Sequence, residues 1–153
     1  MANRDMRQVE PGVYQMGNGP SAKTYISVAK RNADFRAKYP SYSCTTEILE
    51  RSDASVFIKA TIADETGRIL ATGHSEESRS QGPVNRTSAV ENGETSAIGR
   101  ALSNLGFGGE EFASAEEVSG AIIDQAKLEV TDFFAKFIPL VLENSEAIKG
   151  LFA

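Results

Sequence analysis

Apolar and polar residues alternate with two different periods along this chain, and the clearest helical pattern runs from Asn85 to Phe112. At about 100° per residue, apolar side chains fall on one face of a helix: Val90, Ala97, Ile98, Ala101, Leu102 and Leu105. Ser88 and Glu91 have capping-box spacing, which predicts the start of the helix. Gly106, Gly108 and Gly109 predict its end, because glycine readily adopts the left-handed conformation that closes a helix.

Two charged residues of this helix need partners. Glu94 projects from the middle of the apolar face, where a carboxylate needs a cation or several donors, so we interpret it as structural. Arg100 lies at the rim of that face without an acidic residue three or four positions away, so its guanidinium is available to the rest of the fold or to a phosphate. Small residues on the helix, Gly93, Ala97 and Ala101, predict close approach of a sheet or helix.

The preceding chain predicts one helix and three strands. Residues 21–39 form a helical pattern that Pro40 ends, with an exposed side made basic by Lys30, Arg31, Arg36 and Lys38. Residues 42–48 and 56–62 alternate with a period of two, and a turn at 64–67 leads into a third strand at 68–75. Residues 1–20 are rich in glycine and proline with little periodicity, which predicts a mobile N-terminal arm.

These elements predict an α+β fold. An antiparallel three-stranded β-meander is packed by two helices in the order α-β-β-β-α, which forms a core over residues 21–118. Residues 119–153 form an acidic C-terminal segment with an amphipathic helix from about Glu117 to Ile138, broken or kinked at Pro139. Its stripe of Phe133, Phe134 and Phe137 favours core or subunit-interface packing. Alternatively, the acidic segment competes with DNA for a basic track or binds a partner.

Composition sets few limits on function. An apolar content of 41% and a charged content of 24% over 153 residues are ordinary for a globular protein. There is no apolar run of membrane-spanning length and no signal-peptide core at the start, so we expect a cytoplasmic protein. The net charge of −5 argues against nucleic-acid binding, but the excess of acids follows residue 109 and the earlier part is nearly neutral. A local basic track is therefore compatible with this sequence.

The run ETSAIGRALSNLGFGG, followed by FASAEEV, resembles the signature of the phage essential-recombination-function (ERF) single-strand annealing proteins. The segments FRAKYPSYSCTTEILE, VFIKATIADETGRILATGHSEE and VNRTSAVENGETSAIGRAL occur in the order of that family, so the resemblance covers about residues 25–118. It implies ATP-independent binding and annealing of single-stranded DNA in phage-type recombination within a bacterial host, by homo-oligomeric rings or filaments. It also implies a fold similar to that of the eukaryotic Rad-type annealing mediator, and an exonuclease or single-stranded-DNA-binding protein as a candidate partner.

Annealing requires cations that neutralise phosphates and surfaces that hold bases. The candidate DNA-binding residues are Lys59, Arg68, His74, Arg79, Arg86, Arg100 and Phe107. For Arg100 a structural ion pair, for example with Glu94 of another subunit, is as good an explanation as a DNA contact. For Arg79 and Arg86, we favour a DNA contact over the alternative that they are solvated loop charges. Lys59 fits a plain strand residue better, and Phe107 fits a core anchor better.

Several classes of enzyme lack support in the sequence. There is no GxxxxGK[ST] phosphate loop, and GFGG follows a helix, whereas a dinucleotide-binding loop precedes one. With Cys44 as the only cysteine and His74 as the only histidine, a tetrahedral metal site has too few ligands. We therefore expect no catalytic residue, metal or cofactor. The alternatives to annealing are a non-annealing single-stranded-DNA-binding module in replication and a protein-interaction or inhibitor module without DNA affinity.

Overall fold

The computed structural model describes residues 6–80, 82–109, 111 and 113–144. They form two antiparallel three-stranded sheets and three α-helices, in two compact units, Met1–Val118 and Ser119–Ala153, each described here by itself. The first sheet contains β1 (Met6–Glu10), β2 (Val13–Met16) and β3 (Lys23–Ile26), with a short 3-10 turn, η1 (Gly19–Ser21), before β3. The second contains β4 (Ser43–Arg51), β5 (Ser55–Ala63) and β6 (Ile69–Ser78).

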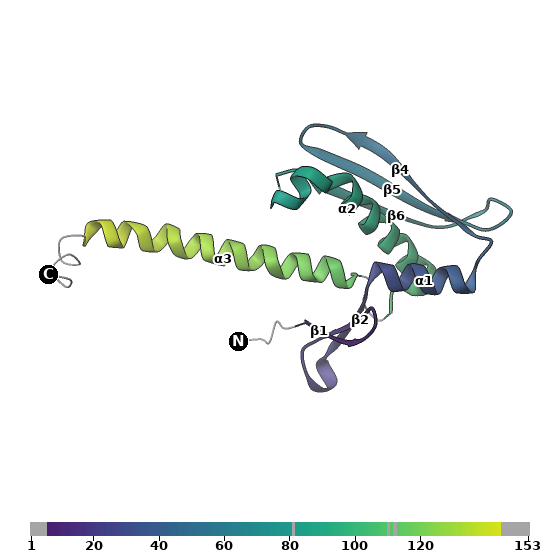
Figure 1. Cartoon of the computed structure of the whole chain (residues 1–153), viewed down its shortest axis with the longest axis horizontal. Helices are drawn as coiled ribbons and strands as arrows, with labels where there is room; N and C mark the ends of the chain where they lie inside the picture. The colour runs from purple at the N-terminus through teal and green to yellow at the C-terminus, as the bar shows by residue number, and fades with distance from the viewer. Residues whose placement is uncertain (1–5, 81, 110, 112, 145–153) are drawn as a thin grey trace. The chain divides into compact units, whose positions relative to one another are not determined.

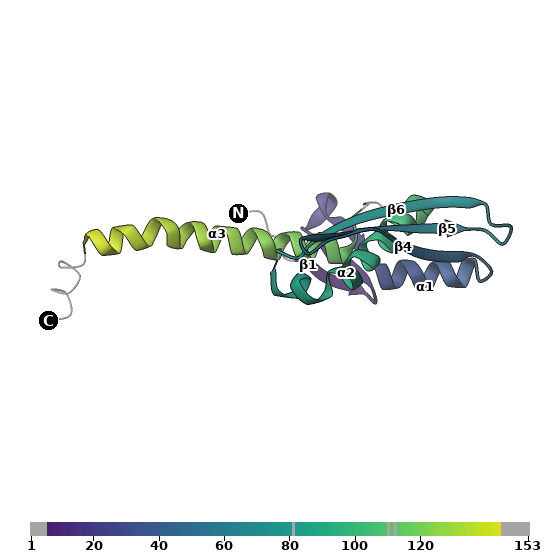
Figure 2. The ribbon, with the colours of Figure 1, turned by 90° about the horizontal axis from the view of Figure 1, so that it is seen from above.

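The predicted α+β class is confirmed. Helix α1 (Val28–Lys38) precedes the meander β4–β5–β6, and helix α2 (Gly82–Leu102) follows it (Figure 1). The period of two in β5 buries one face of the strand, because Val56, Ile58, Ala60 and Ile62 are fully buried while the residues between them are half-buried. Helix α2 packs on β5 and β6, and α1 packs on α2 and contributes Phe35 to the same core. Figure 2 shows the meander seen from above, with α1 beside it.

The close approach that the small residues of α2 predicted occurs at β6. A Cβ atom on Gly73 would overlap the Ala97 carbonyl oxygen and the Ala101 nitrogen, so the strand and the helix backbone touch there. At Gly99, a Cβ atom would lie 2.7 Å from Cγ2 of Val28, which brings α1 equally close. These contacts fix α2 tightly between β6 and α1.

The ends of α2 were only partly predicted. The helix begins at Gly82, and Ser88, the predicted cap, instead interrupts it with φ −124° and ψ 30°. The glycine-rich end is as expected: α2 runs into a π-type turn, η2 (Ser103–Phe107), in which Gly106 has φ 100°. The positive φ is a conformation that a residue with a side chain rarely adopts.

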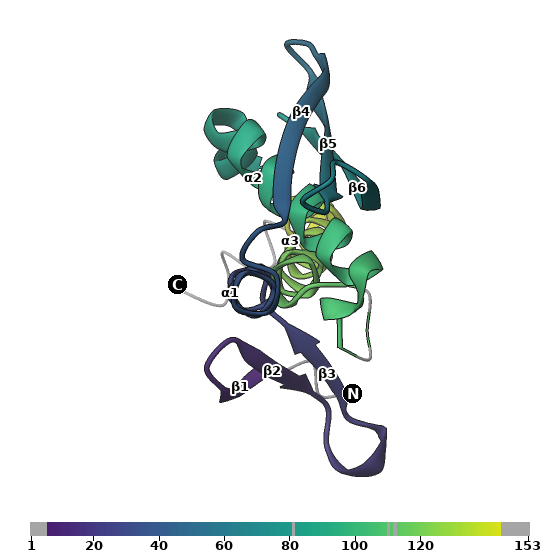
Figure 3. The same ribbon diagram turned by 90° about the vertical axis from the view of Figure 1, so that its right-hand side faces the viewer.

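The N-terminal region differs from the predicted mobile arm, because β1, β2 and β3 pair in an antiparallel sheet (Figure 3). The glycines read as signs of a loop provide hairpin turns, and Tyr25 of β3 is buried. The predicted helix at 21–39 is correspondingly shorter, since its first residues belong to β3 and Ser27 caps α1 by accepting a bond from the Lys30 nitrogen. Residues 1–5 of the predicted arm lie outside the described residues.

The C-terminal helix α3 (Ala115–Glu143) is longer than predicted and continues through Pro139. Its start is a reciprocal capping box: the Ser114 nitrogen donates to Glu117 at 2.8 Å and the Glu117 nitrogen donates to Ser114 Oγ at 3.2 Å. This first turn belongs to the first unit, and the rest of the helix belongs to the second.

Candidate nucleic-acid interface

Three arginines belong to the segments that meet where the β4–β5 hairpin approaches the end of β6 and the start of α2. We call Arg51, Arg79 and Arg86 the hairpin-end arginines. Arg51 is the last residue of β4 and pairs in register with the buried Val56, so its side chain leaves the sheet on the side that α2 covers. The Arg79 nitrogen donates to the Ala54 carbonyl oxygen at 2.8 Å, which ties the end of β6 to the hairpin. Arg51 and Arg86 are exposed.

Carboxylates lie on the same segments as these arginines: Glu50, Asp53, Glu76 and Glu77. Glu77 accepts bonds from Asn85 Nδ2 at 2.8 Å and from Ser96 Oγ at 3.4 Å. Glu50 pairs with Phe57, which alternates with Val56, so Glu50 leaves the sheet on the opposite side from Arg51. Across the described residues, the three arginines take part in no side-chain ion pair.

A second cationic group lies at the other end of β4, and we call Arg36 and Lys38 the α1-end cations. Arg36 donates from its terminal nitrogen to the Tyr42 carbonyl oxygen at 3.0 Å, and its guanidinium lies 5.3 Å from the Phe35 ring centroid. Lys38 Nζ lies 5.3 Å from the ring centroid of Tyr39. Aromatic rings therefore hold both exposed cations at the last turn of α1. The eight residue steps along β4 separate this end from Arg51 by about 26 Å, at ~3.3 Å per residue.

The predicted DNA-binding residues do not form one continuous track. Lys59 and His74 are direct partners across β5 and β6. They lie on the open face of the sheet, where His74 stacks on Phe57 with ring centroids 5.8 Å apart. Arg68 follows the turn between β5 and β6, at the end of the sheet away from the β4–β5 hairpin.

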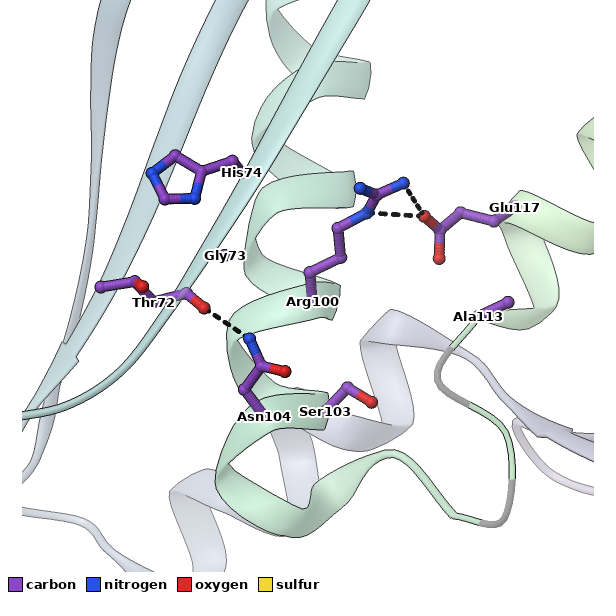
Figure 4. Close-up of a pocket in the computed structure, with 8 residues that line it drawn as sticks. All are labelled: Thr72, Gly73, His74, Arg100, Ser103, Asn104, Ala113 and Glu117. Atoms are coloured by element: carbon purple, nitrogen blue, oxygen red, sulfur yellow. Dashed lines mark hydrogen bonds and ion pairs between the residues drawn. The ribbon is translucent and has the colours of Figure 1, made fainter.

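Arg100 lies near the C-terminal end of α2, beyond the interruption at Ser88 that separates it from Arg86. It lines a hollow of about 520 Å³ beside β6, shown in Figure 4. Its Nε and a terminal nitrogen each lie 3.0 Å from Glu117 Oε1. The ion-pair interpretation therefore holds, with Glu117 of the same chain as the partner in place of Glu94 of another subunit. Glu94 instead accepts a bond from Thr46 Oγ1 at 2.8 Å.

Phe107 is partly buried and packs against the core, which agrees with its alternative interpretation as a core anchor. Its ring meets Phe35 edge-on at 5.9 Å and Tyr39 at 6.2 Å between centroids. A ring held between two others in this way offers little surface for stacking on a base.

For Arg31, the sequence predicts an exposed side chain, and this prediction is wrong. It was assigned to the exposed basic side of α1 but is fully buried, and it donates to the carbonyl oxygens of Gly99 at 2.9 Å and Ala113 at 2.8 Å. Burial lowers the pKa of the guanidinium, and Glu117 and Glu116 partly oppose that shift. The available signal was its spacing from Val28 and Phe35, which puts all three on one helix face.

Comparison with known proteins gives one similarity. A family model described as Slr1353 N-terminal dsRNA-binding domain-like matches residues 32–105, from α1 through the meander and α2 into η2. No curated protein and no solved structure matches the chain significantly. The similarity suggests a nucleic-acid-binding type of domain.

The resemblance to ERF annealing proteins is therefore wrong, because the matching family is a different one. The run that carried it consists largely of small residues and terminal glycines on α2 and η2. Close packing against Gly73 and the turn at Gly106 require such residues whatever the family. Within the part of the chain that the structure describes, no group of side chains could hold a metal ion, and no helix is both long and apolar enough to cross a bilayer.

Proposed function

We propose that the first unit binds double-stranded RNA along the exposed edge strand β4. The hairpin-end arginines and the α1-end cations contact phosphates at two places on one duplex. The observation that carries this proposal is the pair of cationic groups about 26 Å apart, on an α-β-β-β-α unit that is similar to a dsRNA-binding-like family.

The chemistry of an A-form duplex suits this arrangement. Its major groove is too deep and narrow for side chains to read, so proteins recognise such duplexes by shape, through 2′-hydroxyls and phosphates. A rigid sheet that holds cations at both ends of one strand can match the spacing of the backbone without reading bases. Each cation–phosphate contact releases counterions from the duplex, so binding is sensitive to salt. The net charge of −5 opposes the approach of the duplex, and the local contacts must overcome that repulsion.

The test compares a labelled RNA duplex of about 20 base pairs, longer than the ~16 that one such domain spans, with DNA of the same sequence and with both single strands. The double variant Arg51→Ala/Arg86→Ala should weaken binding to duplex RNA. It should also reduce the slope of log K against log salt by about 2, at roughly 0.9 per phosphate contact. The matched control is Arg7→Ala/Lys127→Ala, which removes the same charge from β1 and α3. An unchanged slope in the first variant, or equal loss in the control, refutes the interface.

Annealing of single strands by a ring or filament was inferred from the family resemblance that proved wrong, so it forms no part of this proposal. Tighter binding to single-stranded DNA than to duplex RNA would contradict the proposal. Absence of binding to every probe at low salt would favour the protein-interaction alternative. The direct partners proposed are thus duplex RNA and its phosphate backbone, with no cofactor required.

A further inference from the structure

Helix α3 carries an apolar seam that repeats every three and four residues over more than two heptads. We call the residues at these positions the α3 seam: Ile123, Ala126, Val130, Phe133, Phe137 and Leu140. Phe133 is 57% exposed and Phe137 is 48% exposed, although both are large apolar residues. A strict three-and-four repeat of apolar residues is the pattern of helices that pack in pairs. An exposed seam of this length calls for a partner.

We propose that the α3 seam pairs with the α3 seam of a second copy of this chain, in antiparallel orientation. This inference is independent of the proposed RNA binding. In the register that aligns the two seams, Ile123 faces Leu140 of the other copy, Val130 faces Phe133, and Ala126 faces Phe137. Small and large side chains therefore meet at the Val130–Phe133 and Ala126–Phe137 pairings, which lets the two helices interdigitate.

Charge also selects the antiparallel orientation. Glu129 and Lys136 flank the seam on the same edge, and in the antiparallel register each faces the other residue of the second copy. Within its own helix, Lys136 pairs with Asp132 at 2.6 Å and Glu129 accepts from Gln125 at 3.3 Å, so the contacts between copies add a further partner to each. In a parallel pair, Glu129 would face Phe134 and Lys136 would face Val141, which places a charge against an apolar side chain each time. On the other edge of the seam, Lys127 faces Phe134 in the antiparallel register, so the orientation is favoured by the two Glu129–Lys136 pairs, which a parallel pair lacks.

Pro139 is compatible with this pairing. It lies on the outward side of α3, between the seam residues Phe137 and Leu140. Its ring therefore points away from the seam, and the helix continues past it to Glu143. Leu128, which is 70% exposed, lies on the side of the helix opposite the seam. It offers a matched position for a control.

The first experiment measures the mass of the full-length protein by analytical ultracentrifugation across the micromolar range. Wild type should sediment as a dimer, Phe137→Glu as a monomer, and Leu128→Glu as a dimer. Both variants put the same carboxylate at an exposed apolar position of one helix, and circular dichroism checks that each keeps its helix content. A monomeric wild type, a larger ring or filament, or equal effects of the two substitutions would overturn the proposal.

The second experiment tests orientation with single cysteines in a Cys44→Ala background. In the antiparallel register, Ile123 of the two copies lie about 25 Å apart, at ~1.5 Å per residue, and a disulfide needs Cα atoms within about 7 Å. Neither Ile123→Cys nor Leu140→Cys alone should crosslink, whereas an oxidised mixture should give a heterodimer. Crosslinking of either variant alone would indicate a parallel pair and overturn the orientation. Glu129→Lys should weaken the dimer, and adding Lys136→Glu should restore it.

Discussion

Replacing Arg31 by methionine should destabilise the first unit strongly. Methionine keeps a flexible apolar stem in the core but removes the donors to the carbonyl oxygens of Gly99 and Ala113, which lie 2.9 and 2.8 Å away. Removing a buried charge can be neutral when its partner is removed as well, but these carbonyls belong to the backbone and stay buried. At roughly 1–3 kcal/mol for each unsatisfied acceptor, the expected loss is about 4 kcal/mol.

The assay is urea unfolding followed by far-UV circular dichroism, with the midpoint and the slope fitted separately. Lys30→Met is the matched control, because the neighbouring Lys30 forms only a surface pair with Asp34 at 2.8 Å. Such i,i+4 pairs contribute about 0.3–0.5 kcal/mol. Since small domains have about 5–15 kcal/mol of stability, the Arg31 variant should be partly unfolded under mild conditions. A change in unfolding free energy no larger than that of the control would refute the role assigned to Arg31.

Four further outcomes are expected. Gly73→Val should reduce the free energy of unfolding by more than the ~1–3 kcal/mol typical of overpacking, because the obstructing atoms belong to the α2 backbone. The loss should be visible as a sharply lower melting temperature. Phe107→Ala should cost about 3 kcal/mol in urea unfolding, and it should also weaken RNA binding slightly, because the ring centroid lies 5.8 Å from Lys38 Nζ, one of the α1-end cations. The hydrogen bond from the Thr66 hydroxyl lowers the pKa of Asp64. The ionised carboxylate therefore stabilises the fold fully above its usual pKa of about 4. This stabilisation is lost as the pH falls through the lowered pKa. The stability difference between wild type and Asp64→Asn should therefore shrink in acid. Phe137→Glu should weaken binding to duplexes longer than about 32 base pairs, twice the ~16 spanned by one domain, more than binding to short ones.

Local patterns in the sequence determined the type and order of most elements. The period of two in residues 56–62 predicted β5 because alternate side chains of a strand face opposite sides, and one side is the core. The Ser114 and Glu117 spacing produced the capping box at α3, and the glycines after Leu105 closed α2. These features depend on residues a few positions apart, so the sequence by itself carries them.

The tertiary structure alone decided which distant groups meet. Arg31 finds carbonyls 68 and 82 residues away, and Arg100 finds Glu117 beyond the end of its own helix. The N-terminal strands escaped prediction because their stability comes from pairing with one another and from burying Tyr25, which no local period records. The candidate cations likewise separated into groups at opposite ends of β4 and on the open face of the sheet. A helical or strand period assigns a residue to a face, but the face becomes a core, an ion pair or a binding surface only through the segment that packs against it.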